Sequence, residues 1–336
     1  MSSLQCYSTF KIDVSCAAIT SFTDVASFLS LYDAKKLTYL LGGGSNSIFI
    51  EDFEGSILVN KIMGITHYDT PQNHHLRVGA GENWHELVTL CLQNKWYGME
   101  NLALIPGSVG ACPIQNIGAY GCEVEKFIDS VECVLLETGE QVLLNNVDCQ
   151  FGYRDSIFKH DLAGKVLITH VNFTLPKAYE LETSYGELAQ LDEPTPEKIY
   201  HKVIEVRQSK LPDPAQLGNA GSFFKNPVID QAQFDAISEN YASVPHFMVT
   251  DDREGRDERV KIPAAWLIDQ AGFKGKTLNG VRCHPTQPLV LTNIGGASGA
   301  DVLAMARDIV SSVKQKFGIS LEAEVRLVGK TGLITL

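Results

Sequence analysis

The stretch "PGSVGACPIQNIGAYG", residues 106–121, combines four glycines with valine, isoleucine and tyrosine and has no charged side chain. A disordered linker would not contain apolar residues at this density. The stretch is therefore either an ordered Ω-type loop that packs on itself, or a long loop whose backbone amides face a phosphate or a flat ring. A second glycine-rich segment, "LGGGSN" at residues 41–46, lies in the same half of the chain. Two such segments favour ligand-binding loops.

The glycine run at residues 41–46, taken alone, leaves two interpretations open. It follows a predicted strand, and glycines let backbone amides approach a pyrophosphate closely. The dinucleotide-binding pattern GxGxxG fails, however, because Ser47 occupies its last position and the next segment is strand-like. A plain tight turn and a phosphate cradle therefore fit equally well. "AGFKGKT", residues 271–277, is not a P-loop, because Gln270 stands where that motif begins with glycine.

Hydrophobic periodicity around these loops predicts an α+β protein. Apolar residues recur at helical spacing in residues 23–32, 82–95, 197–211, 264–272 and 300–318. Strand-like patterns occur in residues 37–50, 131–146, 165–176 and 321–329. The second of these is a predicted hairpin around Thr138 and Gly139. A strand-rich region thus precedes a mixed one.

Composition places the chain among ordinary globular proteins. Its 336 residues are 44% hydrophobic and 20% charged, and they suffice for two or three domains. A formal charge of −12 argues against broad nucleic-acid binding, although a local pocket for an anion stays possible. The N-terminus has no signal-peptide pattern, and no apolar stretch is long enough to span a membrane.

Cysteine and histidine spacing predicts no metal site. The eight cysteines include no CxxC pair, and most lie in apolar runs. We therefore expect reduced thiols in the cytoplasm. His74 and His75 have no partner at helical spacing, and we interpret them as exposed polar residues.

Three further segments contain residues whose chemistry stays open. Arg154 in "FGYRDSIFK", residues 151–159, is either a paired structural cation or a clamp for an anion. The charged residues of "EAEVRL", residues 322–327, would share one face of a strand, which is usually a solvated edge. Ser222 lies in "GNAGSFFKNP", residues 218–227, with no histidine within twenty residues. It could cap a helix, hold a phosphate, attack as a nucleophile or donate a proton.

Eight stretches together resemble the UDP-N-acetylenolpyruvoylglucosamine reductase family. They are "LGGGSNSIF", "VGAGENWHELV", "ENLALIPGSVGACPIQNIGAYG", "FGYRDSIFK", "KLPDP", "GNAGSFFKNP", "AAWLIDQAG" and "LEAEVRLVG". The resemblance implies an α+β protein: a two-subdomain FAD-binding fold of the vanillyl-alcohol-oxidase (PCMH) type plus a separate α+β substrate-binding domain. The implied parts are residues 1–66, residues 67–208 completed by residues 318–336, and the substrate-binding domain at residues 209–317. "SYGEL", residues 184–188, resembles type I of the family, in which a tyrosine-bearing loop closes over the substrate.

The resemblance also implies the ligands and the residues that contact them. The cofactor would be non-covalent FAD, the co-substrate NADPH, and the substrate the enolpyruvyl ether of a UDP-sugar. FAD would be bound by Gly42, Gly43, Gly44, Ser45, Asn46, Pro106, Gly107, Ser108, Gly110, Ala111, Asn116, Gly118 and Ala119. The substrate would be contacted by Tyr120, Tyr153, Arg154, Tyr185, Lys210, Asn226 and Gln287. Among these, Tyr185, Lys210 and Asn226 would hold its diphosphate.

The implied reaction reduces the enolpyruvyl group of a peptidoglycan precursor and uses three catalytic residues. Arg154 would face the substrate carboxylate, which the planar fork of a guanidinium fits. Ser222 would donate the proton that follows hydride transfer. Glu324 matches the catalytic glutamate of the family. We hypothesise that it is at least partly protonated, or that it orients a donor.

Two alternative functions stay open: another FAD-dependent oxidoreductase of the same fold, and a non-catalytic protein that binds a nucleotide sugar. The joint presence of Ser222, Arg154 and Glu324 argues against the binder. We expect a cytoplasmic monomer that contacts neither nucleic acid nor membrane and contains no metal. The charged segment at residues 251–259 is a predicted solvated loop.

Overall fold

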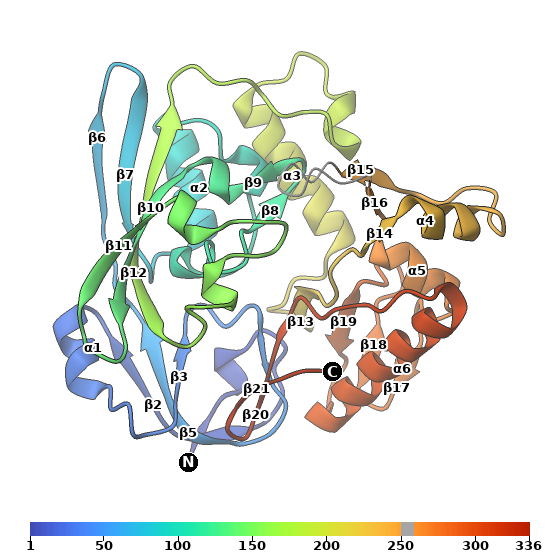
Figure 1. Cartoon of the computed structure of the whole chain (residues 1–336), viewed down its shortest axis with the longest axis horizontal. Coiled ribbons are helices and arrows are strands. Elements are labelled where there is room, and N and C mark those ends of the chain that lie inside the picture. Colours follow the sequence, from blue (N-terminus) through green and yellow to red (C-terminus); the bar gives the residue numbers. More distant parts are fainter. Residues whose placement is uncertain (250–258) are drawn as a thin grey trace. The chain divides into compact units, whose positions relative to one another are not determined.

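The computed structural model describes residues 1–249 and 259–336, so the predicted charged loop, apart from Arg259, lies outside the described residues. The chain, whose path Figure 1 follows, divides into two compact units. Unit 1 consists of Met1–Ser2, Cys16–Ser45 and Phe53–Ser209, and unit 2 consists of Ser3–Ser15, Asn46–Asp52 and Lys210–Leu336.

The first sheet, almost all of it in unit 1, is parallel at its centre. Its order is β1-β2-β5-β3, and β5 pairs in parallel with both β2 and β3. The strands are β1 (Ser2–Ser3), β2 (Ser15–Phe22), β3 (Thr38–Leu41) and β5 (Phe53–Asn60). Helix α1 (Val25–Leu31) follows β2, and Asp24 and Ser27 form a capping box that pairs its first free N–H groups. The predicted helix at residues 23–32 is confirmed.

The second sheet of unit 1 is antiparallel and has the order β11-β10-β12-β7-β6. Its strands are β6 (Ile65–Asp69), β7 (Asn73–Gly79), β10 (Ile128–Leu135), β11 (Gln141–Asn145) and β12 (Val166–Pro176). One face packs on helices α2 (Trp84–Gln93) and α3 (Pro196–Lys210) through a core that includes Trp84, Val131, Phe173 and Val203. The predicted hairpin is confirmed as β10–β11, with Gly139 at a φ of 74° in its turn.

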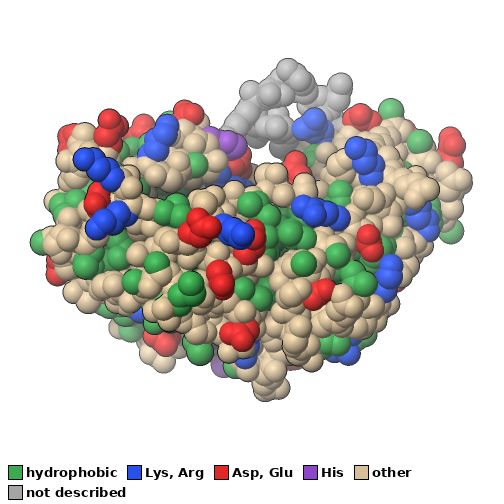
Figure 2. All heavy atoms as spheres, turned by 90° about the horizontal axis from the view of Figure 1, so that it is seen from below, with side chains coloured by type: hydrophobic (Ala, Val, Ile, Leu, Met, Phe, Trp, Pro, Cys, Tyr) green, Lys and Arg blue, Asp and Glu red, His purple; other side chains and the backbone are tan. Residues whose placement is uncertain are grey.

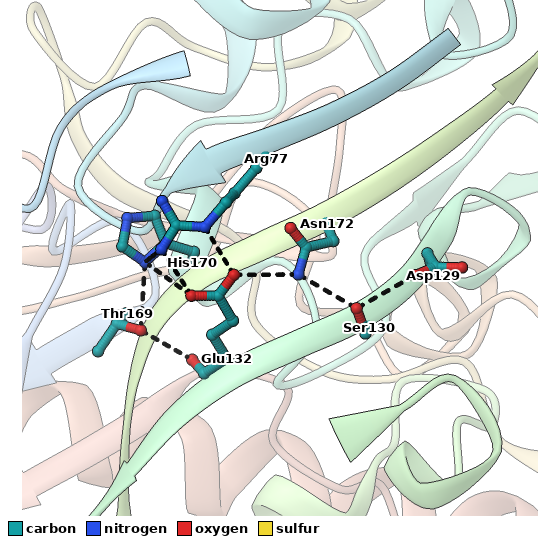
Figure 3. A network of polar contacts seen from close by, with 7 residues as sticks. All are labelled: Arg77, Asp129, Ser130, Glu132, Thr169, His170 and Asn172. Carbon is teal, nitrogen blue, oxygen red and sulfur yellow. Dashed lines mark hydrogen bonds and ion pairs between the residues drawn. The ribbon is translucent and has the colours of Figure 1, made fainter. Parts of the chain in front are cut away.

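The opposite face of this sheet has a ladder of polar side chains (Figure 3). Arg77 of β7 donates two hydrogen bonds of 2.7 Å to the Glu132 carboxylate on β10. Asn172 of β12 donates to Glu132 at 3.3 Å and to Ser130 at 3.1 Å, and His170 Nδ1 lies 3.1 Å from Arg77 Nη2. Side chains therefore cross-link three neighbouring strands in addition to the backbone ladder.

The described residues of unit 2 form three small sheets. The first has the order β13-β19-β18-β17, the second β14-β16-β15, and the third β21-β20-β4. The strands are β4 (Ser47–Phe49), β13 (Gly218–Ser222), β14 (Val228–Asp230), β15 (Phe247–Val249), β16 (Arg259–Lys261), β17 (Thr277–Leu278), β18 (Val281–Cys283), β19 (Val290–Asn293), β20 (Arg326–Gly329) and β21 (Gly332–Ile334). Strand β4 pairs in parallel with β20, which comes from the far end of the chain.

The part of unit 2 that the structure describes also contains the helices α4 (Gln231–Ser238), α5 (Ala264–Gln270) and α6 (Gly299–Phe317). A capping box between Ser298 and Asp301 begins α6, and Gly318 in the left-handed conformation ends it. Its buried stripe consists of Val302, Met305, Ala306, Ile309, Val313 and Phe317. The predicted helices at residues 264–272 and 300–318 are confirmed.

The predicted strand at residues 321–329 is wrong in its first half. Ala323 makes an isolated bridge with Phe224, residues 324–325 form a bend, and only then does β20 begin at Arg326. The chain bends there because its pairing partner changes: Glu324 N–H donates to the Phe223 carbonyl, whereas Arg326 N–H donates to the Asn46 carbonyl. The alternating charges therefore do not share one regular strand face.

The remaining composition-based expectations concern thiols and surface charge. All eight cysteines are free and seven are buried, and burial raises the pKa of Cys91, Cys122 and Cys133 to about 12. Within the described residues, no helix is both long enough and apolar enough to cross a bilayer. On the face drawn in Figure 2, basic and acidic side chains are interspersed.

Candidate active site

The two glycine-rich loops meet within unit 1. The Ser45 hydroxyl donates a 3.0 Å hydrogen bond to the Pro106 carbonyl. A Cβ atom on Gly43 would lie 2.9 Å from Gly107 Cα, and one on Gly42 would overlap the Ser108 hydroxyl. The absence of side chains thus lets the backbones of residues 42–45 and 106–108 touch.

This contact leaves backbone donors without partners. Gly44 and Ser108 are buried, yet within the described residues neither N–H makes a hydrogen bond. Buried N–H groups are rarely left unpaired, and clustered ones form an anion-binding concavity. Gly44 and Gly107 have φ angles of 67° and 126°, which glycine adopts without strain. The donor set fits the pyrophosphate of a dinucleotide such as FAD.

The rest of the 106–121 loop is ordered by its own contacts. A Cβ on Gly110 would lie 2.5 Å from Ala80 Cβ, so the turn packs directly on residue 80. The fully buried Asn116 donates to the Glu123 carboxylate and the Gly152 carbonyl and accepts from Glu125 N–H. Its side chain therefore fixes the loop. Within the loop, Ile117 N–H donates to the Cys112 carbonyl, while the Ser108 N–H has no partner among the described residues, so the two interpretations of the loop sequence are compatible.

Beyond Asn116, the loop forms a two-stranded pair that receives Arg154. Strand β8 (Gly118–Ala119) pairs with β9 (Cys122–Glu123). The Arg154 guanidinium donates to the carbonyls of Gly118 and Asn116, at 3.3 Å for the latter, and lies 4.0 Å from the Glu123 carboxylate. A Cβ on Gly118 would stand 2.8 Å from Arg154 Nη1. Glycine at position 118 is thus what admits the guanidinium.

The backbone of Arg154 is also unusual. Its φ of 55° lies in the left-handed region, which non-glycine residues seldom adopt, and such strain clusters at functional sites. Lys159 holds the conformation by donating to the Arg154 carbonyl at 2.9 Å, and Tyr153 has its ring 5.5 Å from the guanidinium carbon. Arg154 is a half-buried cation fixed in place, which fits a clamp for an anion.

Two tyrosines and a second arginine accompany Arg154 in unit 1. The rings of Tyr120 and Tyr185 meet edge to face at 6.2 Å, and burial raises the pKa of both phenols. Arg207 of α3 interacts electrostatically with Tyr120 and Arg154, and its buried Nε has no hydrogen-bond partner among the described residues. Burial lowers the pKa of this guanidinium. An unpaired buried donor beside a second cation calls for an anionic ligand.

Arg207 is not among the site residues predicted from the sequence. The residue stands one helical turn before Lys210 in the pattern "VRQSK", and in a helix the two share one face. That spacing was a usable signal. An arginine in a helix is nevertheless normally a solvated residue, so only its burial distinguishes it.

In unit 2, Ser222 and Glu324 come from neighbouring segments. Ser222 ends β13, opposite Val290 of β19. The next residue, Phe223, accepts a 2.8 Å hydrogen bond from Glu324 N–H. Phe223 and Phe224 are buried, with ring centroids 4.9 Å apart, and hold this crossing in the core of unit 2. Ser222 and Glu324 themselves are partly exposed.

The other predicted residues of unit 2 have different surroundings. Asn46 donates to the Glu324 carbonyl at 3.2 Å, which links the glycine run to the segment of the glutamate. Asn226 accepts a 2.9 Å hydrogen bond from the N–H of Ala264, the first residue of α5. Gln287 lies in the turn between β18 and β19, where its carbonyl accepts from Val290 N–H. Lys210 is exposed at the end of α3.

Comparison with known proteins decides the family. Residues 16–145 match the profile of an FAD binding domain, and residues 213–328 match that of the UDP-N-acetylenolpyruvoylglucosamine reductase C-terminal domain. All of the chain aligns, at 48% identity, with 96% of UDP-N-acetylenolpyruvoylglucosamine reductase from Pseudoalteromonas atlantica. This chain belongs to the UDP-N-acetylenolpyruvoylglucosamine reductase family. The predicted family is thereby confirmed.

Further relatives agree with this membership. The UDP-N-acetylenolpyruvoylglucosamine reductase of Pasteurella multocida is 44% identical over 99% of this chain and 97% of its own length. The crystal structure of UDP-N-acetylenolpyruvylglucosamine reductase from Thermus caldophilus has a similar fold, with a TM-score of 0.65 over 97% of each chain at 21% identity. This reductase-family chain is therefore an FAD-dependent oxidoreductase with an FAD-binding domain and a separate C-terminal domain, as predicted.

Proposed function

We propose that this chain reduces UDP-N-acetylglucosamine enolpyruvate to UDP-N-acetylmuramate, a step in peptidoglycan precursor synthesis, with NADPH as co-substrate. The observation that carries the proposal is full-length similarity to reductases named for this substrate. It is supported by the anchored Arg154, because the enolpyruvyl group carries a carboxylate. FAD, held by the two glycine-rich loops, would supply the hydride chemistry that connects NADPH to the vinyl carbon.

The FAD site would consist of the two glycine-rich loops. The N–H groups of Gly44 and Ser108 would bind the pyrophosphate, because both lack another partner among the described residues. The remaining proposed contacts are Gly42, Gly43, Ser45, Asn46, Pro106, Gly107, Gly110, Ala111, Gly118 and Ala119. Asn116 would act indirectly, since its amide already holds the loop. Because these contacts are hydrogen bonds and packing, the cofactor would be held non-covalently.

Arg154 would bind the carboxylate of the enolpyruvyl group. Negative charge moves toward this carboxylate once hydride reaches the vinyl carbon, so a fixed cation there stabilises the transition state more than the substrate. The loop carbonyls that hold the guanidinium keep it from reorganising during the reaction. Arg207 would add a second positive charge to the same binding region.

Ser222 would donate the proton that completes the reduction. Its place after a glycine-rich strand and before two buried phenylalanines fixes the hydroxyl on a rigid backbone. The backbone N–H of Glu324 donates to the carbonyl of Phe223, the residue after Ser222. The carboxyl group of Glu324 would orient or share the proton that Ser222 donates. The hydroxyl need not first be deprotonated, so the lack of a neighbouring histidine in the sequence suits this role.

The other proposed substrate contacts would hold the sugar nucleotide. Tyr185, Lys210 and Asn226 would donate to the diphosphate. Tyr120, Tyr153 and Gln287 would be further substrate contacts. Burial raises the pKa of Tyr185, so its phenol stays protonated and can donate. We further propose that the enzyme acts as a monomer in the cytoplasm.

The half-reactions of Ser222→Ala test the catalytic roles. Stopped-flow absorbance should show flavin reduction by NADPH at nearly the wild-type rate, while reoxidation by the enolpyruvyl substrate slows by at least about 100-fold, the usual contribution of a general acid. Ser222→Cys retains a donor and should recover part of the lost rate. Equal loss of both half-reactions would remove Ser222 from the proton step.

The same assay separates the enzyme from its alternatives. A non-catalytic binder would bind the sugar nucleotide without consuming NADPH. Another oxidoreductase of the fold would reduce its flavin with NADPH but would not be reoxidised by the enolpyruvyl substrate. Either result would refute the proposed reaction.

A further inference from the structure

The β6–β7 hairpin gathers two histidines and an aspartate on one face. In the antiparallel register Asp69 lies directly opposite His74, and His67 precedes Asp69 by two residues. Residues two apart on a strand point to the same side, as do directly opposed residues, so these three side chains share a face. His75, next to His74, belongs to the other face.

The three side chains converge on one carboxylate oxygen. His67 Nε2 lies 3.0 Å and His74 Nδ1 2.6 Å from Asp69 Oδ1, and the three potential ligand atoms all lie within 4.8 Å of one another. His67 is stacked on Trp96, with ring centroids 4.0 Å apart and planes 25° apart. Lys177 lies 3.5 Å from the other oxygen, Oδ2. The imidazole of His67 is thus held by stacking, and Oδ1 is kept toward the two rings.

We propose that His67, Asp69 and His74 form a binding site for a divalent transition-metal ion of the zinc type. Two imidazole nitrogens and one carboxylate oxygen are the ligands that zinc, nickel and copper accept, whereas magnesium and calcium prefer oxygen alone. Three protein ligands leave at least one position for water.

The two histidine–aspartate distances are close to what such an ion requires. Ligand atoms bound at about 2.0–2.2 Å in a tetrahedron stand roughly 3.4 Å apart. The two histidine–aspartate contacts of 2.6 and 3.0 Å would open by under about 1 Å as the ion replaces the shared protons. Rotation of the partly exposed Asp69 side chain can supply that movement.

The structure also contains comparison sites. His160 lies 2.8 Å from Asp155, but the described residues bring no third ligand to that pair. Both ring nitrogens of His75 lie near hydroxyls, 3.1 Å from Thr174 and 3.4 Å from Thr70. The proposed ion would bridge β6 and β7 at the edge of the sheet. None of its ligands belongs to the proposed catalytic residues, so the ion would brace the hairpin.

Zinc titration of the tag-free, FAD-loaded protein, after treatment with a chelator, tests the proposal. Cys6→Ser serves as the background because Cys6 is the exposed thiol. Calorimetry should detect one zinc ion per chain. His67→Ala and His74→Ala should each weaken binding at least about tenfold, the lower range for loss of even an outer-shell partner. His75→Ala, the matched control on the other face, should bind zinc like the background.

Copper provides a readout that does not depend on the stability of the variants. Electron paramagnetic resonance of Cu²⁺ bound to the background protein should show hyperfine coupling to two nitrogens, and oxidised flavin gives no signal there. His67→Gln should reduce the coupling to one nitrogen. The proposal fails if the background protein shows no saturable zinc binding, if His75→Ala loses the ion, or if binding survives His67→Ala and His74→Ala unchanged.

Discussion

Gly107 shows at the level of one residue how backbone shape and a loop contact combine. Its φ of 126° would strain any other residue, and a Cβ there would lie 2.9 Å from the Ser45 hydroxyl that ties the two loops together. Gly64 has a similar φ of 115°, but a Cβ there would meet nothing within 4 Å. Alanine would strain the backbone at both positions, but it would disturb the contact between the two loops only at position 107. Comparing the two variants therefore separates these two effects.

We expect Gly107→Ala to weaken FAD binding at least tenfold and Gly64→Ala to leave it unchanged. Both variants should lose stability, on the order of 1–2 kcal/mol, because alanine is unfavourable at positive φ. Flavin fluorescence during FAD titration of apoprotein gives the affinity, and urea unfolding gives the stability. Equal FAD affinity in the two variants would mean that the contact of residues 45 and 107 does not shape the cofactor site.

At the scale of elements, the polar ladder of Figure 3 links β7, β10 and β12 through Arg77 and Glu132. The paired hydrogen bonds from Arg77 lower the pKa of Glu132. Burial and the positive charge of Arg77 lower the pKa of His170 on the next strand. The lowered pKa of Glu132 stabilises the folded state near neutral pH, and this contribution is lost in acid. The lowered pKa of His170 adds nothing at higher pH, where the imidazole is neutral in both states, and opposes folding in acid.

Glu132→Gln tests this linkage. A carboxylate with a lowered folded pKa stabilises the protein above its unfolded pKa of about 4.3, and the contribution disappears as pH falls through the folded value. At pH 7 the variant should be less stable by up to about 1 kcal/mol, because the pair is only partly buried. The difference should shrink toward zero near pH 3 in urea unfolding. Glu140→Gln, in the exposed hairpin turn, should show no such trend.

Elements with strong hydrophobic periodicity could be predicted from the sequence. Elements that begin or end where the backbone changes its hydrogen-bonding partner could not. Helix α6 has a capping box, a continuous apolar stripe and a terminal glycine, all local signals. The bend at residues 324–325 has no local sequence signal, because it forms where the hydrogen-bond partner of the chain changes from Phe223 to Asn46. The cluster of His67, Asp69 and His74 likewise depends on hairpin register, which spacing along the sequence does not reveal.

For the whole molecule, the sequence could propose candidate site residues but not the contacts that hold them in place. Resemblance supplied Arg154 and Ser222, since their motifs are contiguous. The position of the Arg154 guanidinium depends on the carbonyls of Gly118 and Asn116, which lie 36 and 38 residues away in the sequence. The electrostatic surroundings of Arg154 also depend on the buried Arg207. The contacts of Arg154 follow from the packing of distant segments and have no readable pattern in a single sequence, whereas the spacing of Arg207 from Lys210 was a weak local signal.

FAD should order unit 1 before the substrate is present. We expect hydrogen exchange of the Gly44 and Ser108 amides to slow when FAD is added to apoprotein, because bound pyrophosphate would pair these N–H groups. At 100 times its dissociation constant, the cofactor should stabilise the protein by about 2.7 kcal/mol. Riboflavin, which lacks the pyrophosphate, should give much less protection there. Protection confined to unit 2 would contradict the proposed cofactor site.

The parallel pairing of β4 with β20 has a consequence for how the protein is made. Ser47 leaves the ribosome early, yet its partner Arg326 follows 279 residues later. Unit 2 therefore cannot finish folding until almost the entire chain has been translated. Until then, β4 lacks β20, the strand with which it pairs. Closing so long a loop is slow and exposes the nascent chain to misassembly. Ribosome stalling near the C-terminus should thus trap a chain in which unit 2 is unfinished.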